Sequence, residues 1–110
     1  MKFELRNETW TILEKSQEEF NEWNSSYNED GHYYGQTHFV TKEIWLWNEC
    51  TLNTKIKTLR HELMHVYIKE YITNEELSYT EEMLCDISTN AFPFIYDIST
   101  CYRNEMSDRK

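Results

Sequence analysis

The sequence predicts an α+β fold in which a small, mostly antiparallel sheet packs on a central helix that is followed by a second helix. Three observations point to this class. Short runs rich in β-branched and aromatic residues fill the first half of the chain. Apolar residues recur at helical spacing in the second half. The length of 110 residues fits a single domain, residues 1–110, with a small core.

The composition narrows the partners that this chain can take. A net charge of −9 disfavours nucleic acid and anionic membrane surfaces as direct partners, because both repel an acidic protein. No apolar run approaches the length of a transmembrane helix, and residues 1–10 lack the apolar region of a signal peptide. Cys50, Cys85 and Cys101 form no CxxC pair, so reduced, mostly buried thiols are expected. These features together predict a cytoplasmic protein.

The N-terminal quarter of the chain carries both strand and helix signals. Residues 2–6 and 9–14 form either two short strands or a strand that runs into a helix. Residues 14–23 predict a short polar helix with Phe20 and Trp23 on one side.

A loop over residues 24–32 leads into a predicted hairpin. Its strands cover residues 33–40 and 43–48 and turn at Thr41-Lys42. Apolar side chains fall on both faces of the second strand, which predicts that both faces are at least partly covered.

The second half of the chain predicts long helices. Residues 53–72 form the first, and because both of its sides are largely apolar it should lie at the centre of the domain. After a turn over residues 73–78, a second helix covers residues 80–92. Pro93 ends or kinks this helix, and a last helical segment runs through residues 94–103.

The stretch TLRHELMHVYIKEY, within the first long helix, carries the pattern H-E-x-x-H at His61, Glu62 and His65. Residues four apart lie on one face one turn apart, so His61 and His65 can point two imidazole nitrogens at one metal ion. Glu62 is offset by about 100° around the axis, which places its carboxylate beside the metal. The pattern predicts one zinc ion per chain, with Glu62 taking a proton from zinc-bound water as it attacks a peptide bond.

Chance rarely produces this pattern. A shuffled chain of the same composition would contain it about 0.02 times. The structural alternative is a helix with one exposed and one buried histidine. Both His61 and His65 fall on a helix face that the sequence predicts to be buried, where imidazoles without a shared ligand would leave polar nitrogens unpaired. The zinc site is therefore favoured.

A catalytic zinc site takes three protein ligands and keeps one position open. Glu81 and Glu82, at the start of the second long helix, are the candidates for the third ligand. Glu81 lies on the side of the apolar stripe that must face the histidine helix. Glu82 lies almost opposite, although with Asp86 one turn later it would offer both a ligand and a carboxylate that orients a histidine. Glu81 is the preferred ligand, and either residue could instead be a first-turn acid favoured by the helix dipole.

Taken together, these residues resemble a known group. The segment TLRHELMH, preceded by the strand EIWLW and followed by the acidic helix EEMLCDISTNAF, is similar to the small zincin-like metallopeptidases of prophages and mobile elements, nearest the ImmA/IrrE family. The resemblance covers residues 33–92, and its specific part is H-E-x-x-H. The chain differs from the family pattern at Met64, where glycine is customary.

The resemblance implies a zincin-like fold, with a few-stranded sheet packed on the H-E-x-x-H helix and the third ligand on the next helix. It implies His61 and His65 as ligands, Glu62 as the catalytic acid/base, and a protein substrate such as a repressor-type transcription factor. The strand nearest a zincin site often holds its substrate by sheet addition, and core packing is an equal alternative for that strand here. The rival functions are a zinc-stabilised module that binds a regulatory partner without cutting it, and a metal-free helical protein.

Overall fold

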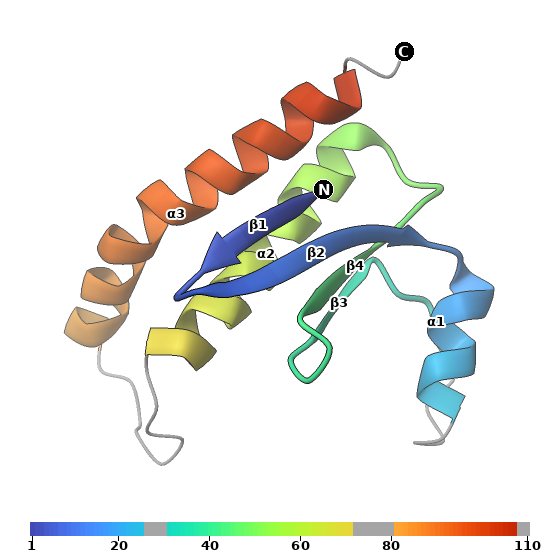
Figure 1. The fold of residues 1–110 in the computed structure, drawn as a ribbon, viewed down its shortest axis with the longest axis horizontal. Coiled ribbons are helices and arrows are strands. Elements are labelled where there is room, and N and C mark those ends of the chain that lie inside the picture. The colour runs from blue at the N-terminus through green and yellow to red at the C-terminus, as the bar shows by residue number, and fades with distance from the viewer. Residues whose placement is uncertain (26–30, 72–80, 108–110) are drawn as a thin grey trace.

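The chain folds into a four-stranded sheet and three helices, shown in the computed structural model of Figure 1, so the α+β class is confirmed. The structure describes residues 1–25, 31–71 and 81–107, without the side chains of residues 71, 81–84 and 86. The elements in chain order are β1 (Lys2–Leu5), β2 (Glu8–Lys15), α1 (Gln17–Asn24), β3 (Gly35–His38), β4 (Glu43–Trp47), α2 (Leu52–Tyr71) and α3 (Glu81–Ser107).

The sheet is mixed: two of its three strand pairs are antiparallel, in line with the expectation of a mostly antiparallel sheet, and one is parallel. Its strand order is β1-β2-β4-β3. The two outer pairs, β1–β2 and β3–β4, are antiparallel hairpins, whereas the central pair, β2–β4, is parallel. A parallel pair needs a crossover connection, and the segment that contains α1 and β3 provides it.

Two tight turns place non-glycine residues in the left-handed region of φ. Arg6 and Asn7 join β1 to β2 with φ values of 51° and 67°, so the two-strand interpretation of the N-terminus is correct. Lys42 has φ 59° in the turn between β3 and β4, where the sequence predicted a turn.

One face of the sheet forms the main core. Strand register brings Phe3 opposite Trp10 and Ile12 opposite Ile44 on this face. Both α2 and α3 cover it, and Figure 1 shows the two helices side by side against the sheet. The buried helix residues of this core are Ile56, Leu59, Leu63 and Val66 of α2, and Ala91, Ile95 and Tyr102 of α3.

The short helix α1 lies on the opposite face. Ser16 caps it: its hydroxyl accepts a hydrogen bond from the Glu19 N–H at 3.1 Å, and the Glu19 carboxylate accepts one from the Ser16 N–H at 3.3 Å. Phe20 is fully buried and packs edge-on against Trp45. The helix begins three residues later than expected, because β2 continues to Lys15 through its pairing with β4.

Pro93 does not end α3, so of the two alternatives, that it ends the helix or kinks it, the first was wrong. A single helix runs from Glu81 to Ser107 with Pro93 inside it. Proline removes one backbone hydrogen bond and costs about 3 kcal/mol in a helix interior. Here Ala91, Ile95 and Ser99 are buried on both sides of the proline, and this packing holds the helix together.

Two further expectations concern the surface of the fold. Cys85 and Cys101 are exposed free thiols and Cys50 is half-buried, so the prediction of mostly buried thiols was wrong. Both exposed thiols lie on α3 away from the side that packs on the core. Within the described ranges, no helix combines the length and apolarity needed to cross a bilayer. The predicted turn over residues 73–78 and the predicted first residue of the second long helix, Thr80, lie outside the described residues.

Candidate metal and peptide site

The middle of α2 brings the two motif histidines together. The helix begins after Thr51, whose hydroxyl accepts a hydrogen bond from the Thr54 N–H at 3.2 Å, and this sets the phase of the following turns. The Nε2 atoms of His61 and His65 lie 3.1 Å apart. Two nitrogens bound to one tetrahedral zinc ion lie about 3.3 Å apart, so the pair fits two positions of such a site. A single hydrogen bond between neutral imidazoles is the metal-free alternative.

Both histidines are exposed, although the sequence predicted a buried histidine face. The buried positions of α2 are Ile56, Leu59, Leu63 and Val66, and a single long stripe of this kind covers the sheet. His61 and His65 lie off that stripe. Exposed imidazoles can bond to water, so burial does not require a shared ligand here, and the support for one is the convergence of the two nitrogens.

Glu62 is the buried member of the motif. Its side chain is 8% exposed, and the Thr37 hydroxyl donates a hydrogen bond to its Oε2 atom at 2.6 Å. Thr37 lies opposite Ile44 in the β3–β4 register and therefore points to the α2 side of the sheet. A hydroxyl donor to a carboxylate makes a short, strong hydrogen bond, so β3 holds the Glu62 carboxylate in one orientation.

Gly35 allows β3 to approach α2 this closely. A Cβ atom there would meet Thr58 Cγ2 of α2, and it would lie 3.1 Å from the carbonyl oxygen of Trp45 and 3.5 Å from Glu62 Cγ. The absence of a side chain therefore creates the contact between the edge strand and the helix. With only two glycines in the chain, this position has a structural reason to be one of them.

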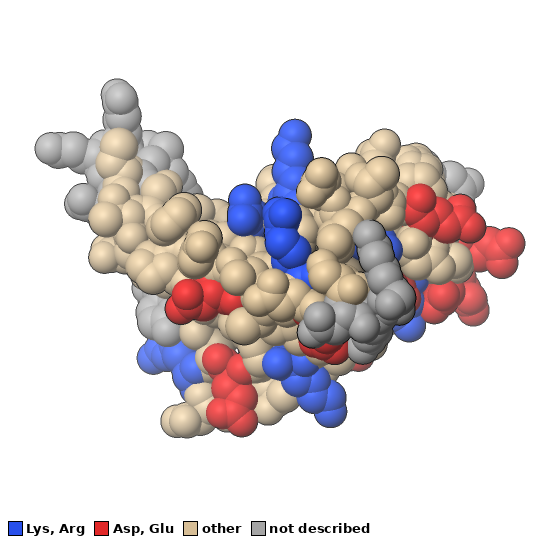
Figure 2. All heavy atoms as spheres, turned by 90° about the horizontal axis from the view of Figure 1, so that it is seen from above, with Lys and Arg blue, Asp and Glu red and all other residues tan. Residues whose placement is uncertain are grey.

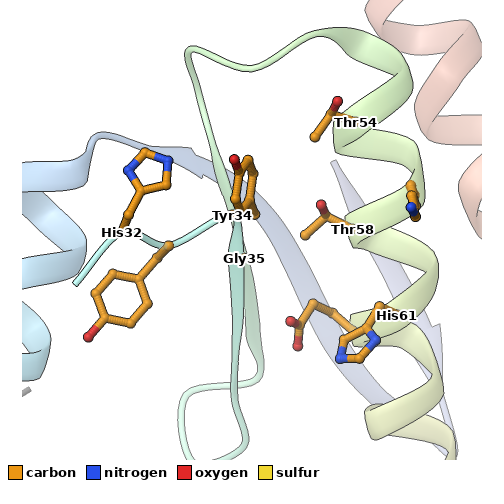
Figure 3. A pocket seen from close by; sticks show the side chains of 9 residues that line it. His32, Tyr34, Gly35, Thr54, Thr58 and His61 are labelled. Carbon is orange, nitrogen blue, oxygen red and sulfur yellow. The ribbon is translucent and has the colours of Figure 1, made fainter.

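A cavity of about 620 Å³ opens between the start of β3 and the exposed side of α2. Figure 3 shows Thr54, Thr58 and His61 on the helix side and His32, Tyr34 and Gly35 on the strand side. The full lining is His32, Tyr33, Tyr34, Gly35, Thr54, Lys57, Thr58, His61 and Glu62. The cavity is therefore lined by one proposed zinc ligand, His61, and by the proposed base, Glu62.

Two rings on the strand side of this cavity, His32 and Tyr34, pack perpendicular to Trp47, which does not itself line the cavity. The His32 and Trp47 rings are 4.5 Å apart at 84°, and the Tyr34 and Trp47 rings are 5.6 Å apart at 78°. The backbone pairs as well, since the Trp47 N–H donates to the Tyr34 carbonyl at 2.9 Å. Edge-to-face contacts of this kind are favourable and fix ring orientation. His32 and Tyr34 therefore form an aromatic wall of the cavity, and their contacts with Trp47 hold them in place.

The third ligand is not placed by the described residues. Glu81 opens α3, but its side chain and that of Glu82 lie outside the described part of the structure. Among the residues that are described, no group of three or more His, Cys, Asp or Glu is close enough to hold a metal ion. Phe94 packs near Tyr67, and along a helix Glu81 lies about 20 Å before Phe94. Glu81 can share a zinc ion with His65 only if the first turns of α3 come close to His65. The contact between Phe94 and Tyr67 does not bring them there.

Sequence reasoning missed Thr37, Gly35 and the aromatic wall. The register of the predicted hairpin would have placed Thr37 on the same side as Ile44, toward the histidine helix. It also places residue 34 beside Trp47, which the pattern of aromatic residues could have indicated. His38 lies on the other face of the sheet and is 6% exposed.

Comparison of the chain with protein-family profiles, with curated protein sequences and with solved structures gives no match.

Proposed function

We propose that the chain is a zinc-dependent peptidase in which His61 and His65 bind the metal and Glu62 is the general base. The observation that supports this most directly is the pairing of an exposed, convergent histidine pair with a buried, oriented carboxylate at one end of a cavity. A helix with two incidental histidines has no need of a buried glutamate between them. Burial of a carboxylate is costly unless it is hydrogen-bonded, and Thr37 supplies that bond.

Each residue of the proposed site has a defined role. A bound zinc ion supplies a Lewis acid that activates water for attack on a carbonyl group. Glu62 accepts the proton released from that water and returns it to the leaving amine. Thr37 keeps the accepting oxygen in place. Glu81, with Glu82 as its alternative, remains the predicted third ligand.

The substrate in this proposal is a peptide or protein segment in extended form. The strand β3 lies at the edge of the sheet, and an extended segment can pair with such an edge by backbone hydrogen bonds. The cavity beside it would take one side chain between the aromatic wall and α2. A repressor-type regulatory protein is the substrate class that the sequence resemblance favours.

The first experiment separates metal binding from chemistry. The protein is purified without any chelator and analysed for zinc, and about one zinc ion per chain is expected. The variant Glu62→Gln should retain that zinc and lose about 100-fold or more of the peptidase activity toward a peptide library. Glu18→Gln, an exposed acid on α1, is the matched control and should behave as wild type. Wild-type protein without zinc, whose stability a chelator leaves unchanged, would contradict the proposal.

A second outcome would favour the binding-module alternative. If wild-type protein holds zinc and Glu62→Gln retains full biological activity, the zinc stabilises a domain that binds a regulatory partner without cutting it. The variants Glu81→Gln and Glu82→Gln identify the third ligand, since only the ligand's loss should raise the dissociation constant for zinc by about 10-fold or more.

A further inference from the structure

The face of the sheet that carries α1 has a hollow of its own, far from the histidine motif. It has a volume of about 360 Å³ and is lined by Glu19, Glu22, Trp23 and Trp45. Glu19, Glu22 and Trp23 come from α1, and Trp45 comes from β4. Because Trp45 and Ile44 alternate along β4, this hollow and Glu62 lie on opposite faces of the sheet.

The hollow combines aromatic surfaces with carboxylates. The Trp23 and Trp45 rings are 5.8 Å apart at 63°, and Trp23 is 42% exposed. The Trp45 ring is fixed, because its Nε1 atom donates a hydrogen bond to Glu43 at 2.8 Å. Tryptophan faces attract cations, and adjacent carboxylates strengthen that attraction.

The chain already places a cation there. The Lys15 ammonium group lies 4.9 Å from the centre of the Trp45 ring and 3.2 Å from Glu19 Oε2. Glu22 is exposed and has no salt bridge among the described residues. Lys15 thus engages Glu19 and Trp45, while Glu22 is exposed and the Trp23 side chain, which contacts His38 and Trp45, is 42% exposed.

The histidine that contacts both tryptophans, His38, does not repel a cation. The His38 ring stacks on Trp45 at 4.2 Å and also contacts Trp23 at 4.5 Å. Burial holds the pKa of His38 below its ordinary value, so the ring is neutral near pH 7. The surroundings are acidic as well: Figure 2 shows Asp and Glu side chains gathered at the end of the molecule where α1 lies in Figure 1.

We propose that this hollow binds an arginine side chain from a basic segment of a partner protein, with the guanidinium group against Trp23 and its N–H groups on Glu22. The guanidinium competes with the Lys15 ammonium group for Trp45 and Glu19. Arginine fits better than lysine, because its planar group stacks on aromatic rings and forks onto carboxylates. The net charge of −9 draws basic partners toward the chain. This surface is independent of the proposed peptidase site, and the chain would bind there whether or not it holds zinc.

The test uses the full chain and defined probes. The probes are three short blocked peptides that differ in one residue, which is arginine, lysine or citrulline, the uncharged relative of arginine. Binding is followed by the indole N–H signals in NMR spectra and by calorimetry. The arginine peptide should shift the signals of Trp23 and Trp45 and leave that of Trp10 unchanged, with weaker binding of lysine and none of citrulline. Equal binding of the arginine and citrulline peptides would overturn the proposal.

Two substitutions sharpen this test. Lys15→Met should strengthen arginine binding by about 3-fold or more, because it removes the internal cation. Glu22→Gln should weaken it by about 3-fold, whereas Glu4→Gln on β1 changes the net charge equally and should have little effect. Weaker binding by Lys15→Met, or equal losses from both glutamate variants, would overturn the proposal.

A third substitution tests the aromatic contribution. Trp23→Ala should weaken binding by about 5-fold or more, while Trp23→Phe should retain part of it. Circular dichroism checks that both variants keep their helices. Unchanged affinity in the folded Trp23→Ala variant would overturn the proposal.

Discussion

The two faces of the sheet are built from the same strands and differ in how completely they are covered. Toward α2 and α3, the strand residues Trp10, Ile44 and Leu46 are fully buried. Toward α1, Trp45 is nearly buried, but Trp23 remains 42% exposed and Trp47 is half-buried. A long helix pair closes one face, whereas an eight-residue helix covers only part of the other. The first face supplies stability, and the second leaves aromatic surface available for recognition.

The strand β3 serves both faces. Gly35 and Thr37 point to α2, where they permit and orient the Glu62 contact. Gln36 and His38 point to α1: Gln36 exchanges hydrogen bonds with Asn24, and His38 stacks on tryptophan. Alternation along four residues therefore divides one edge strand between two different environments.

The largest expected effect compares equivalent leucines on the two faces. Leu63→Ala removes a fully buried side chain of α2 and should lower the free energy of unfolding by about 2–5 kcal/mol. Leu13→Ala, on the α1 side of β2, should cost less than half as much, because Leu13 is only half-buried. Denaturant unfolding of both variants measures the difference. Equal losses would mean that the two faces are packed alike.

The next effect concerns the contact between β3 and α2. Gly35→Ala forces a methyl group against Thr58 and should lower the free energy of unfolding by about 1–3 kcal/mol. Adding Thr58→Ser removes the Cγ2 atom that the methyl group meets, so the double variant should recover part of the loss. Denaturant unfolding of the four chains completes the cycle. Strict additivity of the two substitutions would show that this contact does not limit the approach.

A smaller effect tests the attachment of α1. Ser16→Ala removes the cap and should lower the free energy of unfolding by about 1 kcal/mol, because the Glu19 N–H loses its acceptor. Ser88→Ala, at an exposed position inside α3, is the control and should be close to neutral. Thermal unfolding, monitored by circular dichroism, measures the change in stability of both variants. A loss from Ser88→Ala as large as that from Ser16→Ala would contradict the capping role.

The last prediction is a pH effect confined to the α1 face. The pKa of His38 is lowered from its ordinary value of 6.5, chiefly by burial and further by Lys15, while Glu43 opposes the shift. The unfolded chain therefore takes up a proton more readily than the folded chain as the pH falls. Stability should be fully present above the ordinary pKa and should decline as the pH falls through the folded-state value.

The control for this prediction is His38→Asn, which removes the titrating group. Free energies of unfolding at about pH 8 and about pH 5 are compared for both chains. The wild type should lose more stability than the variant over this interval. Parallel pH profiles would show that His38 does not contribute.

Local signals in the sequence were sufficient for most of the elements. The histidine helix was expected over residues 53–72 and spans Leu52–Tyr71, because twenty residues of helical periodicity are hard to misread. The β3–β4 hairpin was also expected, although β3 is shorter than predicted. The parallel pairing of β2 with β4 was missed, because strands separated by a helix carry no local signal of their order.

The site was less accessible to sequence reasoning than the fold. The spacing of His61, Glu62 and His65 was enough to place two histidine nitrogens together. It could not show that the histidines face solvent while Glu62 is buried, because that depends on which side of α2 the sheet covers. Likewise, the Thr37 contact depends on how β3 packs against the helix, which no short segment of sequence specifies.

The two left-handed turns also contact the last turn of α2. Arg6 donates a hydrogen bond to the Glu70 carbonyl at 2.6 Å, and Lys42 bridges the Glu8 and Glu70 carboxylates at 2.7 and 3.1 Å. Two hairpin turns thus reach from the sheet to the last turn of the histidine helix, where carbonyl groups lack helical partners. Glycine would relax either turn, but it would remove the side chain that makes the connection. A redesign that replaced these residues with glycine to relieve backbone strain would therefore remove the contacts that join the end of the helix to the sheet.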